Sequence, residues 1–95
     1  MSADSASLFR LDGRVAFVSG AAGHLGRAMA WALGEAGAHL ILNGRTAARL
    51  DALALDLARA GMSAEIAAFD VAEPAAVRAF FAGRPRLDVL VNNAV

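Results

Sequence analysis

The stretch FVSGAAGHLGRAMA, residues 17–30, places three glycines between an apolar run and a segment with helical periodicity. Residues 14–18 are rich in valine and end at Ser19 and Gly20, a pattern typical of a buried strand followed by a tight turn. Apolar residues then recur at spacings of three and four, and Gly37 stands where a helix would end. This predicted buried stripe consists of Leu25, Met29, Leu33 and Ala36. The stretch therefore predicts a strand, a glycine turn and a helix.

A glycine loop in this position can bring backbone N–H groups close to a pyrophosphate, because a residue without Cβ leaves room and the helix dipole attracts anions. We expect Gly20 to form the tight turn, Gly23 to permit close approach of the phosphates, and Gly26 to let the helix pack against the strand. The same spacing also suits a turn that binds nothing. The strand and helix on either side favour nucleotide binding.

The alternation of strands and helices continues to residue 93, and cap or turn residues bound the predicted elements. Thr46 is placed to cap a second helix that stops at Gly61, and Pro74 favours the first turn of a third helix. The predicted strands are residues 14–18, 38–43, 63–70 and 87–93. The predicted apolar faces of the second and third helices are Leu50, Leu53 and Leu57, and Val77, Phe80 and Phe81.

Four apolar strands that alternate with three helices predict an α/β fold, with a parallel sheet covered by helices on both faces. We expect residues 1–95 to be the amino-terminal, dinucleotide-binding part of a single domain, with residues 1–12 as a tail. The sequence stops just after a predicted strand, so we expect an unpaired sheet edge and an uncovered apolar surface, with the remainder of the domain absent.

Composition excludes several functions. Nine basic residues balance nine acidic ones, so overall charge favours neither nucleic acid nor an anionic membrane as a partner. There is no cysteine, and His24 and His39 lack companions at a ligand spacing, so we expect no metal site. No signal peptide or membrane-spanning run is recognisable, which predicts a cytoplasmic protein. All nine basic residues are Arg, and neither Lys nor Tyr occurs, which closes several catalytic roles.

Four motifs stand in order, each at the carboxyl end of a predicted strand: SGAAGHLG (19–26), NGR (43–45), FDV (69–71) and LVNNA (90–94). Together they resemble the short-chain dehydrogenase/reductase family over essentially the whole chain. His24 and Val95 stand where members of that family usually have glycine. The resemblance implies a Rossmann-like doubly wound sheet, incomplete here, with four strands and three helices present.

The resemblance also implies a cofactor cleft lined by residues from all four strand ends. Asp70 and Val71 would lie at the adenine, although Asp70 also fits a capping pattern before the third helix. His24 would face either the phosphates or solvent. The implied cofactor-binding residues are Ser19, Gly20, Gly23, His24, Leu25, Gly26, Asn43, Arg45, Thr46, Asp70, Val71, Asn92, Asn93 and Ala94.

The end of the second predicted strand favours NADP(H) over NAD(H). An acidic residue there would hold the ribose hydroxyls of NAD, and none is present. Asn43 and Thr46 offer hydrogen-bonding groups, and the fork-shaped guanidinium of Arg45 suits a 2′-phosphate. The alternative is that Arg45 is an exposed turn residue without a ligand.

These features predict the NADP(H)-binding part of an enzyme that moves a hydride between the cofactor and a carbonyl or secondary alcohol. Within the family, reductases of ketoacyl thioesters and dehydrogenases of sugar acids or polyols are most similar. Family members use a tyrosine and a lysine beyond the fourth strand, so we expect no catalytic residue within residues 1–95 and no activity from them alone.

The resemblance further implies a small-molecule substrate bound by the absent region, and a homo-oligomer, either dimer or tetramer, in the complete protein. The alternative from another class is a non-catalytic nucleotide-binding module, or one half of a split protein.

Overall fold

The structure, a computed structural model, describes residues 10–84 and 86–93. Strands and helices alternate in the order β1 (Val15–Val18), α2 (His24–Glu35), β2 (His39–Gly44), α3 (Ala47–Arg59), β3 (Ala64–Ala68), α4 (Pro74–Phe81) and β4 (Val89–Val91). All strand pairs are parallel, and the sheet order is β3-β2-β1-β4. The predicted α/β fold with a Rossmann-like parallel sheet is confirmed.

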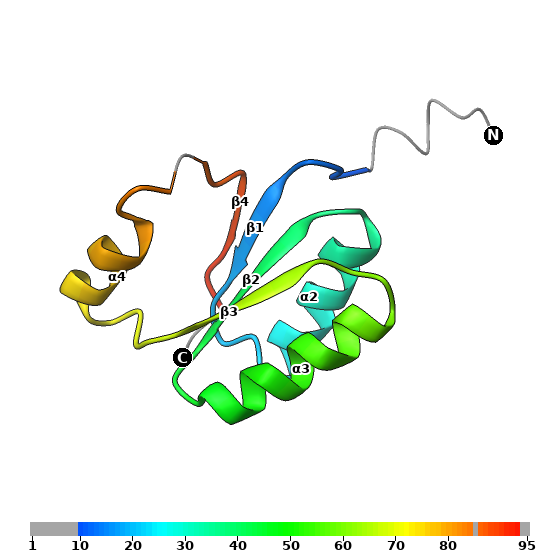
Figure 1. Ribbon diagram of the computed structural model, residues 1–95. Coiled ribbons are helices and arrows are strands. Elements are labelled where there is room, and N and C mark those ends of the chain that lie inside the picture. Colours follow the sequence, from blue (N-terminus) through cyan, green and yellow to red (C-terminus); the bar gives the residue numbers. More distant parts are fainter. Residues whose placement is uncertain (1–9, 85, 94–95) are drawn as a thin grey trace.

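The helices cover both faces of the sheet, with α2 and α3 on one face and α4 on the other (Figure 1). Successive strand residues point to opposite faces. Ala16 and Val18 of β1 therefore join the core against α2 and α3, whereas Phe17 joins the core against α4. On the α4 face the Phe17 and Phe81 ring centroids lie 5.3 Å apart. The sheet is thus packed on both sides, as the unbroken apolar strands predict.

Helix α2 packs against the sheet through small residues, and the prediction that Leu25 is buried is wrong. The buried residues of α2 are Gly26, Ala30 and Gly34, whereas Leu25 is 61 % exposed. A Cβ on Gly26 would collide with the carbonyl oxygen of Gly20. Helix α2 lies so close to the loop after β1 that only small residues fit at the positions facing that loop and the sheet.

Helices α3 and α4 follow their predicted patterns. Helix α3 buries Leu50, Leu53 and Leu57. Thr46 is its N-cap residue, as predicted, although its side chain makes no capping hydrogen bond. Helix α4 begins at Pro74, and its predicted apolar face of Val77, Phe80 and Phe81 is half-buried. No helix within the described residues has the length and apolarity needed to cross a membrane.

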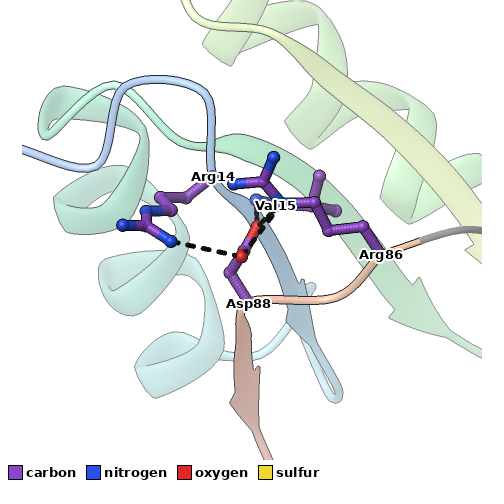
Figure 2. Close-up of polar contacts among 4 residues, drawn as sticks. All are labelled: Arg14, Val15, Arg86 and Asp88. Atoms are coloured by element: carbon purple, nitrogen blue, oxygen red, sulfur yellow. Dashed lines mark hydrogen bonds and ion pairs between the residues drawn. The ribbon is translucent and has the colours of Figure 1, made fainter.

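Asp88 fixes the start of β4 to β1 at the amino edge of the sheet (Figure 2). Its carboxylate accepts hydrogen bonds from the Val15 N–H at 2.7 Å and from Arg86 Nε at 2.9 Å, and Arg14 lies at 3.5 Å. The Val15 N–H, followed by the two guanidinium groups, lowers the pKa of Asp88 below its ordinary value. The register of β4 on β1 is therefore anchored at its first residues.

Strand β4 is shorter than the predicted strand and lies at the edge of the described sheet. It pairs with β1 alone among the described strands, and Leu90 is 62 % exposed. Because β4 ends at Val91, Asn92 and Asn93 follow it at the carboxyl edge, next to the loop after β1.

Candidate nucleotide-binding site

The loop between β1 and α2 requires glycine at two positions. Gly20 has φ +62°, which side-chain-bearing residues rarely adopt, and Gly26 packs against the Gly20 carbonyl. Both structural roles predicted for these glycines are confirmed. Gly23 is the N-cap of α2, and a Cβ there would meet the Gly20 oxygen at an ordinary 3.5 Å. Its predicted role toward a phosphate stays a prediction.

The end of β4 is tied to this loop through Ser19. The Ser19 hydroxyl donates to the Val91 carbonyl at 3.1 Å and accepts from the Asn93 N–H at 2.7 Å. The Asn93 amide donates in turn to the Gly20 carbonyl at 3.4 Å. Ser19 is 2 % exposed. The paired asparagine segment therefore holds the turn at Gly20 in place.

Asn43, at the end of β2, also uses its side chain within the protein. The residue is 1 % exposed, and its amide nitrogen donates to the carbonyls of Ala67 and Phe69 at 2.9 and 3.0 Å. The Asn43 carbonyl accepts the Ala21 N–H at 2.9 Å. The amide nitrogen of Asn43, a residue predicted to offer a hydrogen-bonding group to the cofactor, thus joins the end of β2 to β3.

A pocket of about 280 Å³ opens at the carboxyl edge between the ends of β2 and β3. Asp70 and Val71 line it, and their predicted place at the adenine stays a prediction. The N-cap of α4 is Glu73, so the capping alternative for Asp70 is wrong. The Asp70 carboxylate instead accepts a hydrogen bond from the Ala72 N–H at 2.9 Å and holds the turn before α4. The remaining lining residues are Gly20, Asn43, Gly44, Arg45, Phe69 and Ala72.

A second pocket, of about 190 Å³, adjoins the first through shared Gly20, Gly44 and Arg45. Its other lining residues are Ala22, Gly23, Thr46 and Arg49. Arg45 lines both pockets, and its guanidinium has no hydrogen bond or ion pair within the described residues. Sequence reasoning missed Arg49, and its spacing of four from Arg45 was the available signal.

Several other residues that were predicted to bind the cofactor do not line these two pockets. His24 and Leu25 begin α2, are exposed and line neither pocket. Asn92 borders a separate, mainly apolar pocket of about 240 Å³ on the α4 side, which Ser19 and Val71 also line. Ala94 lies outside the described residues.

The opposite, amino edge carries a larger hollow of about 540 Å³, bordered by Arg10, Glu35 and Met62. No residue predicted to bind a cofactor lines it. Within residues 10–84 and 86–93, no three His, Asp or Glu side chains gather as they would around a metal ion.

The residues at the carboxyl edge fit a dinucleotide. The close packing at Gly20 and Gly26 leads directly into the start of α2, where helix N–H groups can face an anion. The 280 Å³ pocket at the ends of β2 and β3 has room for part of a nucleoside, and Arg45 lines both this pocket and the next one.

Comparison with known proteins agrees with this geometry. Residues 14–95 match the short chain dehydrogenase family. The chain is 38 % identical over 91 residues to the gluconate 5-dehydrogenase of Gluconobacter oxydans, covering 92 % of this chain and 36 % of that protein. It thus spans about a third of the length of that curated relative.

Two solved structures are similar in both fold and sequence. A metagenomic short-chain oxidoreductase in complex with NADP has a TM-score of 0.83 at 41 % identity, over 88 % of this chain and 40 % of that one. A gluconate 5-dehydrogenase from Burkholderia cenocepacia, in complex with NADP and tartrate, has a TM-score of 0.84 at 41 % identity, over 95 % and 37 %. With the family match over residues 14–95, these similarities show that the chain belongs to the short chain dehydrogenase family.

Proposed function

We propose that this chain is the NADP(H)-binding part of an oxidoreductase that transfers a hydride between NADP(H) and a carbonyl or secondary alcohol. One observation carries the choice of cofactor. Arg45, directly after β2, lines two adjoining pockets and has no ion pair within the described residues, and no acidic residue stands at that strand end to hold a ribose diol. The NADP complexes of the two similar structures support it.

Different parts of the carboxyl edge would bind different parts of the cofactor. The loop from Gly20 to Gly26 would hold the pyrophosphate, and Asp70 with Val71 would line the adenosine pocket. Arg45 and Thr46 would contact the 2′-phosphate. Ser19, Asn43 and Asn93 keep the backbone of this edge in place through their internal hydrogen bonds.

The nicotinamide, when bound, supplies or accepts the hydride. A proton must also move to or from the substrate oxygen, and the usual tyrosine and lysine are absent from residues 1–95. Arginine stays protonated at neutral pH and cannot relay that proton. We infer that residues 1–95 are one part of a single Rossmann-fold domain. Other residues of that domain would perform the proton transfer and bind the substrate, so residues 1–95 alone would be inactive.

The substrate that we favour is a sugar acid or polyol. Both gluconate 5-dehydrogenases support this choice, since each aligns over nine-tenths or more of the chain. A ketoacyl thioester is the second candidate of the same reaction class. We further propose that the complete protein is a cytoplasmic homo-oligomer.

The test is a titration of NADPH and NADH against the protein expressed at its full coding length, in the wild type and in Arg45→Ala. A hydrogen bond to a charged group contributes roughly 1.5 to 3 kcal/mol, so the variant should bind NADPH about ten- to a hundredfold more weakly and bind NADH nearly as before. A wild-type preference for NADH would contradict the proposal. Binding without turnover of any alcohol or ketone would favour a non-catalytic nucleotide-binding module.

A further inference from the structure

Arg49 is one of four arginines that have no ion pair within the described residues, and one of two among these that line a pocket at the carboxyl edge. Within the described residues, the arginines with ion pairs are Arg10 with Asp12, Arg14 and Arg86 with Asp88, Arg27 with Asp56, and Arg84 with Glu65. Arg45, Arg49, Arg59 and Arg78 have none, and of these four Arg45 and Arg49 line the 190 Å³ pocket, which has no acidic lining residue. An anion bound in this pocket would be attracted by both guanidinium groups.

The position of Arg49 is defined by a contact with the glycine loop. Its Nη2 donates to the Ala22 carbonyl at 3.2 Å, across 27 residues of sequence. Arg49 lies in the first turn of α3, while Ala22 precedes the start of α2. The guanidinium group has further N–H donors, so this one bond orients it and leaves others for a ligand.

No acidic residue lines the 190 Å³ pocket, and Asp51, two residues after Arg49 on α3, lines neither pocket. Asp70 lines only the adjoining 280 Å³ pocket, and its carboxylate already accepts the Ala72 N–H. Asp56, further along α3, is paired with Arg27 at 3.0 Å. A phosphate monoester beside Arg45 would therefore meet a second guanidinium that the loop has already oriented.

We propose that Arg49 is a specificity-determining residue that acts with Arg45 to bind the 2′-phosphate of NADP(H). The inference rests on the proposed function and adds a second guanidinium to it. The Ala22 contact places this guanidinium at the rim shared by the glycine loop and α3. One side chain thereby contributes to the choice of cofactor and to the shape of the phosphate loop.

The test compares Arg49→Met with Arg59→Met in the protein expressed at its full coding length. Arg59 is the last residue of α3, is exposed and lines neither pocket, so its substitution removes the same charge from the same helix. Titrations measure the Kd of NADPH, NADH and adenosine 2′,5′-bisphosphate, and the thermal midpoint confirms that each variant folds.

Arg49→Met should weaken NADPH and the bisphosphate about tenfold and change NADH by less than about twofold, because only the first two carry the 2′-phosphate. Arg59→Met should leave the Kd of each of the three ligands within about twofold of the wild-type value. Arg49→Lys should recover part of the loss, since it keeps the charge without the planar fork.

Two outcomes would overturn the inference. An equal loss for NADPH and NADH would mean that Arg49 supports the loop alone, and unchanged affinities would mean that it contacts no phosphate. If the wild type prefers NADPH in either case, the proposed function stands and only the role of Arg49 fails. A wild type that binds neither cofactor would overturn the proposed function itself.

Discussion

The two edges of the sheet are built by different interactions. At the amino edge charged side chains pair with one another, as Asp88 does with Arg14 and Arg86. At the carboxyl edge neutral groups hold the chain, as Ser19 and Asn93 do through backbone hydrogen bonds. The arginines of that edge have no acidic partner in the described part of the chain.

The contrast between paired charges at the amino edge and unpaired arginines at the carboxyl edge suggests that the first edge stabilises the fold and the second binds the cofactor. Paired charges satisfy each other and leave little attraction for a ligand, so the amino edge serves to close the fold. Unpaired guanidinium groups beside a rigid backbone loop keep their affinity for an anion. Substitutions at the two edges should therefore have separable effects on unfolding and on cofactor affinity.

The largest effect is expected from Gly26→Val, which breaks the carboxyl edge. A Cβ at Gly26 would meet backbone atoms of Gly20 and Ala21, which cannot move aside as a flexible side chain can. We expect a loss of about 3 kcal/mol in the free energy of unfolding, or failure to fold, measured by urea denaturation. Gly23→Ala is the control and should cost less than about 1 kcal/mol, because its Cβ makes only an ordinary contact. Equal losses in the two variants would contradict the close packing at Gly26.

Gly20→Val should affect both stability and affinity at the carboxyl edge. Gly20 has φ +62°, and its Cβ would lie 3.1 Å from the Asn93 carbonyl oxygen. Backbone strain of this kind costs roughly 1–3 kcal/mol. We also expect NADPH affinity to fall by more than tenfold, because the turn that presents the loop would be displaced. A folded variant that titrates with unchanged NADPH affinity would remove Gly20 from the proposed pyrophosphate site.

The smallest effect is expected from Asp88→Asn at the amino edge. The pKa of Asp88 is lowered in the folded state by the Val15 N–H, Arg86 and Arg14, so the carboxylate contributes stability above its unfolded pKa of about 4. That contribution is lost as pH falls through the lower folded pKa. The urea midpoint of the variant should be below that of the wild type at pH 7, and the two should converge in acid.

The same variant tests whether the two edges are independent. NADPH affinity of folded Asp88→Asn should match that of the wild type, because Asp88 begins the approach to β4 while Asn93 follows its far end. A large change in NADPH affinity would show that the amino-edge anchor also positions the cofactor edge. A gap in urea midpoint that does not depend on pH would contradict the ionic role of Asp88.

The sequence by itself determined the order of the elements and the edge at which the candidate site lies. Strand periodicity, the glycines at 20, 37 and 61, and Pro74 are local signals, and each acts within a few residues of where it stands. Parallel pairing then brings the four motifs together, because the carboxyl ends of parallel strands share one edge. Arg45 could be predicted as a cofactor-binding residue because it stands directly after the second predicted strand.

Only the tertiary structure decided what individual side chains do at that edge. Leu25 is exposed because α2 approaches the sheet through Gly26, a distance that helical periodicity does not encode. The Asn43 amide is occupied by β3, and Arg49 is oriented by Ala22, so both roles depend on partners more than 20 residues away. Spacing along the chain shows which residue types are present, whereas the direction of each hydrogen bond depends on how separate elements pack in three dimensions.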